Sequence, residues 1–317
     1  MSRKTRNILK IGKSSLAITL PKKWVQKQGL KEGDEVVLEE TTKGYLIIRP
    51  GLESRAEEGL TGIITIGKGR ENSLERIIIA YYQAGYTKIK VKPATGRVDT
   101  HLRESVRKSL RRLIGLEIIE EGTDYITLET IVDTSSMKID KVLSRMEILV
   151  LNSAKDLRDY TIYLDKDILR TIIGRDEDID KFYFLLSRQV NLSLKYVGYS
   201  EKVGVEEPSL LLPLFSYGKT IERIGDVLVS IARMTKNSNL ARENAEIIFR
   251  TIRSAINAFR NGNNRDMLTV TDTYQAFFKT FSMETWENYL TGNILSLCLD
   301  IIESKIEIDA LRAVKRP

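Results

Sequence analysis

The spacing of apolar and polar residues divides this 317-residue chain into three parts. Residues 1–50 alternate over short runs, as strands do, residues 59–134 mix alternating and helical spacing, and from residue 136 the spacing is helical throughout. A polar linker, Gly51–Glu58, separates the first two parts. The pattern therefore predicts a multidomain fold, in which the helical part is itself divided into domains 136–238 and 239–317.

The first part is predicted to consist of four short strands and one short helix. Pro21 begins the helix at a position where its missing N–H costs nothing, and Gly29 ends it. Strands this short bury little surface, so this part is expected to need a partner to be stable. The predicted strands are Asn7–Ile11, Leu16–Leu20, Glu35–Thr41 and Tyr45–Arg49.

The second part alternates between strands and helices, which is typical of a small α/β layer. Its pattern indicates no chemistry of its own. The predicted elements are strands at 62–66 and 88–91, helices at 73–84 and 100–113, and strands at 116–120 and 125–130.

The third part contains six predicted helices in two groups of three. Turn signals interrupt the helical spacing at Leu164-Asp165, at 198–208 and at Asn261–Asn264. The two groups form an internal repeat of about eighty residues. The predicted helices are 137–163, 166–196, 208–234, 240–259, 265–281 and 285–314.

The net charge of +7 comes almost entirely from the first fifty residues, which hold eleven Lys and Arg against five Asp and Glu. Nine of those basic residues precede the first acidic residue, Glu32. Such a surplus of positive charge on one small domain is expected where the binding partner is a polyanion. For Lys22 and Lys23, a solvated first helical turn is the alternative to a phosphate contact, and the helix dipole slightly disfavours cations there.

Residues 3–50 resemble the AbrB/SpoVT family of DNA-binding domains. The resemblance rests on Lys10–Ser15, Leu20–Trp24, Gly29–Asp34 and Ile48–Pro50. It implies a swapped-hairpin β-barrel in which two chains interleave, and a homodimer that binds double-stranded DNA with the first strands and their loop. The implied DNA-binding residues are Arg3, Lys4, Arg6, Lys10, Lys13, Ser14, Ser15, Lys22 and Lys23.

Two pairs of carboxylates stand four residues apart on predicted helices, Asp176 with Asp180 and Glu222 with Asp226. This spacing places both members of a pair on one helix face, where they repel each other unless a cation lies between them. Neighbouring helices in a bundle lie about 8–10 Å apart, so the two pairs can share cations. A solvated acidic face is the alternative for an isolated pair of this kind.

The string Glu222–Asp226, followed by Ile231 and Ala232, resembles the signature of the PhoU family of phosphate-uptake regulators. The resemblance implies two pseudo-symmetric three-helix bundles whose paired acidic motifs bind multinuclear metal clusters at the bundle surface. It assigns this role to Asp176, Asp180, Glu222 and Asp226. A site made only of oxygen ligands suits Mg²⁺, Mn²⁺ or iron.

The second group of helices departs from this pattern. Aligned with the first group, it has Ser296 in place of Glu222 and Leu268 in place of Asp176, so each pair loses one carboxylate. Asp300 and Glu303 are weaker metal candidates. We expect this second site to be weak or absent, in a degenerate bundle kept for packing.

Several classes of protein are disfavoured. One cysteine, Cys298, and one histidine, His101, cannot build a His-based triad, a thiol dyad or a zinc site. No apolar run approaches the roughly 18 residues that span a bilayer, and Met1–Lys13 lacks the pattern of a secretory signal, so we expect a cytoplasmic protein without membrane insertion. We expect no enzyme: metal-assisted hydrolysis is the least favoured function, because no evident pocket or general base accompanies the carboxylates.

Ile78–Tyr82 and Arg111–Glu121 resemble segments of archaeal proteins that join an AbrB module to a PhoU module. The combined resemblance implies a transcriptional regulator of phosphate uptake, whose helical bundles sense phosphate status or bind a partner. The alternative is an adaptor that docks on components of a phosphate transporter and uses the N-terminal module mainly to dimerise. The nine uninterrupted basic residues favour DNA binding, because dimerisation does not require them.

Overall fold

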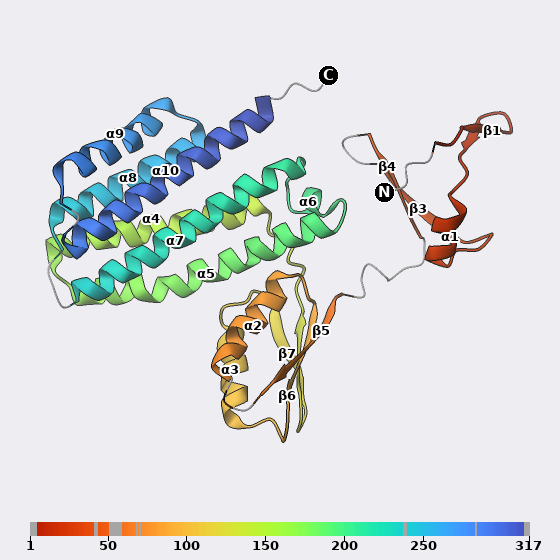
Figure 1. Cartoon of the computed structure of the whole chain (residues 1–317), viewed down its shortest axis with the longest axis horizontal. Helices are drawn as coiled ribbons and strands as arrows, with labels where there is room; N and C mark the ends of the chain where they lie inside the picture. Colours follow the sequence, from red (N-terminus) through yellow and green to blue (C-terminus); the bar gives the residue numbers. More distant parts are fainter. Residues whose placement is uncertain are drawn as a thin grey trace. The chain divides into compact units, whose positions relative to one another are not determined.

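The computed structural model describes residues 5–40, 44–50, 59–67, 69, 71–236, 240–282 and 284–313. The chain falls into two compact units, residues 1–59 and residues 60–317. The first unit holds two hairpins and a short helix, and the second holds a small sheet with two helices followed by a set of long helices (Figure 1). The predicted linker Gly51–Glu58 lies outside the described residues.

The first unit contains two antiparallel hairpins with a short helix between them in the sequence. Gly12 adopts a positive φ of 67° in the turn of the first hairpin, and helix α1 (Lys22–Gln28) follows Pro21 and ends at Gly29 in the left-handed conformation. The first hairpin is shorter than predicted, with three residues in each strand. The strands are β1 (Leu9–Ile11), β2 (Ser15–Ala17), β3 (Val36–Glu40) and β4 (Leu46–Pro50).

The first unit has almost no core of its own. Among its described residues, Leu30 alone is buried. Nine large hydrophobic side chains in the described part of its strands and their flanks are exposed, and they are Ile8, Leu9, Ile11, Leu16, Ile18, Val37, Leu38, Tyr45 and Leu46. The two hairpins form separate two-stranded sheets in the single chain, so the swapped-hairpin barrel and its second chain stay predictions.

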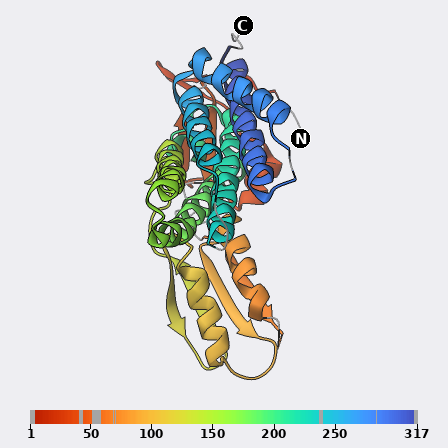
Figure 2. The same ribbon diagram turned by 90° about the vertical axis from the view of Figure 1, so that its left-hand side faces the viewer.

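The second unit begins with a four-stranded sheet in the order β5-β6-β8-β7, which we call, with its two helices, the α/β domain. Strands β5 and β6 are parallel, and the other neighbours are antiparallel. Both helices cover the same face of the sheet (Figure 2), and the buried residues of that face form one hydrophobic cluster. The elements are β5 (Thr61–Ile66), α2 (Glu71–Gln83), β6 (Lys88–Pro93), α3 (Thr100–Leu110), β7 (Leu116–Glu121) and β8 (Ile126–Thr130).

The rest of the second unit is helical, as predicted. The region 198–208, predicted as a turn, contains two short helical segments, α6 (Tyr199–Lys202) and η1 (Pro208–Leu210). None of the helices in the described part of the chain has the length and apolar character that a membrane crossing requires. The long helices are α4 (Ile139–Tyr163), α5 (Lys166–Lys195), α7 (Leu211–Thr235), α8 (Arg242–Asn261), α9 (Asn264–Thr280) and α10 (Trp286–Ala313).

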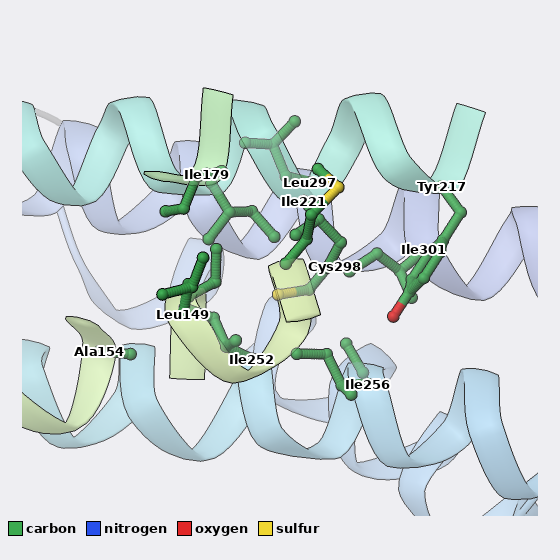
Figure 3. Packing of buried hydrophobic residues seen from close by; sticks show 14 of the residues in the cluster. Leu149, Ala154, Ile179, Tyr217, Ile221, Ile252, Ile256, Leu297, Cys298 and Ile301 are labelled. Carbon is green, nitrogen blue, oxygen red and sulfur yellow. The ribbon is translucent and has the colours of Figure 1, made fainter. Parts of the chain in front are cut away.

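The two helical triplets, α4-α5-α7 and α8-α9-α10, share one continuous hydrophobic core. Ile179 and Ile221 of the first triplet lie in the same cluster as Ile252 and Leu297 of the second (Figure 3). The free thiol of Cys298 is buried in this core. The predicted repeat therefore folds as two triplets packed into a single body, and neither triplet has a separate core.

A buried charge network also links the triplets. Nε of Arg260, on α8, lies 2.9 Å from both carboxylate oxygens of Glu147, on α4. The Tyr217 hydroxyl, on α7, donates to the same carboxylate at 2.6 Å. A carboxylate that is 6% exposed is costly unless it is paired and hydrogen-bonded, and Glu147 is both.

Two glycines of α7 allow α5 to approach closely. A Cβ at Gly218 would lie 2.1 Å from Cδ2 of Leu186, and a Cβ at Gly225 would lie 2.9 Å from Cδ1 of Ile179. Both neighbours are buried side chains of α5 and have little freedom to move. The glycine in the Glu222–Asp226 string is thus required by packing.

We predict that Gly218→Ala destabilises the helical body by up to about 2 kcal/mol, because the overpacking costs about 1–3 kcal/mol and the gain in helix propensity offsets only about 1 kcal/mol of this. The measurement is urea unfolding followed by the far-ultraviolet helical signal. Gly174→Ala, on α5, is the matched control: no atom lies within 4 Å of the added methyl group, so it should stabilise by up to about 1 kcal/mol. If Gly218→Ala increased the stability, this result would contradict the close approach of α7 to α5.

Candidate functional site

The predicted DNA-binding residues that the structure describes lie on the first hairpin and on the first turn of α1, except Arg6, which precedes the hairpin. Lys10 is in β1, Lys13 and Ser14 are in the turn, and Ser15 begins β2. All of the predicted residues that the structure describes are exposed, and they are Arg6, Lys10, Lys13, Ser14, Ser15, Lys22 and Lys23. Arg3 and Lys4 lie outside the described residues. This arrangement presents amines and hydroxyls that can bind phosphate oxygens.

The four carboxylates predicted as metal ligands lie together between α5 and α7, and we call them the acidic cluster: Asp176, Asp180, Glu222 and Asp226. Burial raises the pKa of Asp176 to about 6, with further contributions from the charges of Asp180 and Asp226. Burial likewise raises the pKa of Asp180 and of Glu222, and the charge of Asp226 adds to both shifts. The charges of the carboxylates on α5 and α7 therefore affect one another.

Two cations of the protein are bonded to the acidic cluster. The Arg112 guanidinium, in the turn after α3, donates to Asp180 and also to Glu75 of α2 at 2.8 Å. The Lys219 ammonium, on α7, donates to both oxygens of Glu222 at 2.8 and 2.7 Å. Burial alone would lower the pKa of Lys219, but its bonds to Glu222 raise it.

The acidic cluster does not fit a metal ion in this arrangement. Asp180 and Glu222 are bonded to Arg112 and Lys219. Within the described ranges, no group of three or more His, Cys, Asp or Glu side chains is placed so that it could hold a metal ion. The assignment of Mg²⁺, Mn²⁺ or iron to these residues stays a prediction.

The acidic cluster is also more buried than a bundle-surface site would be. Asp180 is 6% exposed and Glu222 is 8% exposed, although Asp226 is exposed. Arg112, Glu75 and Lys219 were not predicted as site residues, because the α/β domain was expected to be separate from the helical part. A signal was present in α5: Asp180, Phe184, Arg188 and Asn191 recur at helical spacing and so share one side of the helix.

The weaker candidates, Asp300 and Glu303, lie on α10 beside a groove of about 450 Å³ that α7 lines with Lys219 and Arg223. Burial raises the pKa of Asp300, the charge of Glu303 adds to the shift, and Arg223 opposes it. Ser296, aligned with Glu222, donates to the carbonyl oxygen of Gly292 within its own helix at 3.0 Å. Their role as metal ligands stays a prediction.

Two family models match the chain. A model described as antidote-toxin recognition MazE, bacterial antitoxin, matches residues 9–55, and the PhoU domain model matches residues 143–235. The chain joins a MazE/AbrB-type domain to a PhoU domain. The PhoU domain covers most of α4, all of α5 and α7, and the whole acidic cluster. Searches of curated proteins and of solved structures gave no match.

We predict that the helical body formed by the two triplets loses stability as pH rises from about 4 to about 6, because the raised pKa of Asp176 means that the folded state binds more protons than the unfolded state in this window. Asp176→Asn should reduce this loss and increase stability at pH 7. The measurement is the urea midpoint of the helical signal at pH 4, 5, 6 and 7.

Glu177→Gln, an exposed neighbour on the same helix, is the matched control and should leave the pH dependence as in the native protein. Asp180 and Glu222 have raised pKa values too, so part of the loss should persist in Asp176→Asn. If the urea midpoint depended on pH in the same way in the native protein and in Asp176→Asn, protonation of Asp176 would not be linked to stability.

Proposed function

We propose that the chain is a cytoplasmic, DNA-binding regulator of phosphate uptake. The observation that carries the proposal is the row of exposed basic side chains along the first hairpin and α1, in a segment without an acidic residue before Glu32. Such a field binds DNA mainly through phosphate contacts. The PhoU domain on the same chain supports phosphate as the regulated nutrient.

The DNA-binding form is proposed to be a homodimer through the first unit. Its exposed strand residues, such as Leu9, Leu16 and Leu38, would remain in water in a single chain, and a unit of this size whose described residues include one buried apolar side chain lacks a stabilising core. A second copy that interleaves its hairpins would cover these side chains. This pairing also supports the AbrB-like barrel expected from the sequence.

The helical part is proposed to sense phosphate status or to bind a partner, and not to catalyse a reaction. Two of the four carboxylates of the acidic cluster, Asp180 and Glu222, are bonded to Arg112 and Lys219, which opposes their use as a nucleophile or a general base. A screen for phosphatase activity should therefore be negative for the full-length protein.

An adaptor that docks on a phosphate transporter is the second candidate. It is favoured by three consecutive exposed apolar residues, Ile162, Tyr163 and Leu164, where α4 ends and α5 begins. An exposed apolar group of this kind suits a protein partner. Under this reading the first unit serves mainly to dimerise, and DNA binding should not exceed that of a random competitor.

We predict that the full-length protein binds DNA from upstream of its own gene and of phosphate-transport genes, measured by fluorescence anisotropy over a salt series. The triple variant Lys10→Gln, Lys13→Gln, Lys22→Gln should weaken binding to operator and random DNA alike. Because each lost phosphate contact reduces the slope of log affinity against log salt by about 0.9, the triple variant should reduce it by about 2–3 for each chain that contacts the DNA, and by about 5 for the proposed homodimer.

Lys141→Gln, an exposed lysine of α4, is the control for loss of charge and should leave the slope unchanged. Binding that never exceeds an unlabelled random competitor would overturn the regulator and favour the adaptor. An unchanged slope in the triple variant would place the DNA contact elsewhere on the chain.

A further inference from the structure

Helix α5 carries a second contact face, on the side of the α/β domain. Asp180, Phe184, Arg188 and Asn191 follow one another at intervals of four, four and three residues, so they share one side of the helix. We call these four residues the joint face. Phe184 belongs to the hydrophobic core of the α/β domain, and Asn191 Nδ2 donates to the carbonyl oxygen of Gln83 at 3.0 Å.

One end of the joint face is held by a buried arginine. Arg188 is 2% exposed, and its Nη1 donates to the carbonyl oxygens of Tyr82 and Tyr86 at 2.7 and 2.8 Å. These carbonyls lie in and just after the last turn of α2, where the helix dipole concentrates negative charge. Arg188 therefore ties the C-terminal end of α2 to α5.

The other end is held by the acidic cluster through Arg112. Its guanidinium bonds Asp180 of α5 and Glu75 of α2, and it lies 5.3 Å from the centre of the Phe184 ring. The side chains of Glu75 and Asp180 are 16% and 9% exposed. Charges this poorly solvated are screened by salt much less than a surface pair.

The contact is polar and incompletely satisfied. Nε of Arg112 and Nε of Arg188 are buried without a hydrogen-bond partner among the described residues, and so is Oε1 of Gln189, next to Arg188. Buried polar atoms without partners are costly, and proteins rarely keep them in a rigid core. The contact between α5 and the α/β domain is thus less well stabilised than the apolar cores on either side of it.

We infer that the acidic cluster serves in this chain as the docking site for the α/β domain. Arg112 is the cation that binds Asp180 there, in the place that the PhoU resemblance gives to a metal ion. Arg112 bonds Asp180, Lys219 bonds Glu222, and the described residues form no group suited to a metal. A free cation would have to displace Arg112 before it could use Asp180. The inference concerns contacts inside residues 60–317 and does not depend on DNA binding.

The first test is hydrogen–deuterium exchange of the full-length protein, read at the amides of α2 and of residues 83–86. Arg112→Gln and Asp180→Asn should each raise exchange there at least tenfold, and the double variant should match Arg112→Gln, because that variant already removes the bond to Asp180 along with the bond to Glu75. Arg111→Gln, an exposed arginine in the same turn, is the matched control. Effects that multiply in the double variant, or Arg112→Gln behaving as Arg111→Gln does, would overturn the inference.

The second test is titration with Mn²⁺ alone, followed by the electron paramagnetic resonance of the free ion. Arg112→Gln should bind Mn²⁺ at least tenfold more tightly than the native protein, and adding Asp180→Asn should abolish the gain. Equal affinity of the native protein and Arg112→Gln for Mn²⁺, including no binding by either, would contradict the inference that Arg112 takes the place of a metal ion. Far-ultraviolet circular dichroism confirms folding, and Asp180→Asn tests the same contact from α5 if Arg112→Gln unfolds.

Neither measurement contains DNA. A negative result in these two tests therefore does not affect the proposal that the chain is a DNA-binding regulator. Likewise, a failure of DNA binding does not affect the inference that the acidic cluster is the docking site for the α/β domain.

Discussion

The burial of carboxylates between α5 and α7 is the constraint on which the second unit depends. Asp180 and Glu222 are almost fully buried, so each requires a cation within hydrogen-bond distance. Lys219 supplies one from α7 itself, whereas Arg112 supplies the other from the α/β domain. The position of the α/β domain is consequently tied to the charge balance of the PhoU domain.

The surrounding packing gives the helices little room to absorb a change in that balance. Gly218 and Gly225 hold α7 against α5 at a distance that excludes even a methyl group. The Glu147–Arg260 pair and the shared core fix the two triplets to each other. A change in the charge of the acidic cluster is therefore transmitted most readily to the joint face, where the contacts are polar and incompletely satisfied.

The helices were predictable because their apolar residues recur at the helical period over many turns; the turn at Leu164 and the end of α1 at Gly29 followed from local signals. The meeting of the acidic pairs followed from helix spacing and the PhoU resemblance. The bond between Arg112 and Asp180 could not be predicted, because it joins residues 68 positions apart across two packed elements. For the same reason, nothing local indicated that Asp180 would be buried.

The joint face offers a physical basis for communication along the chain. Strand β5 begins at Thr61, soon after the end of the first unit, so the α/β domain stands in the sequence between the basic hairpin and the PhoU domain. Coupling requires an element with two arrangements whose equilibrium a ligand can shift by binding one of them better. Separation of the α/β domain from α5 would expose the unpaired donors Nε of Arg112 and Nε of Arg188 to water, which satisfies them, so these two atoms oppose the docked arrangement. An effector that changes the charge of the acidic cluster would shift the balance between the two arrangements by as much as its affinities for them differ.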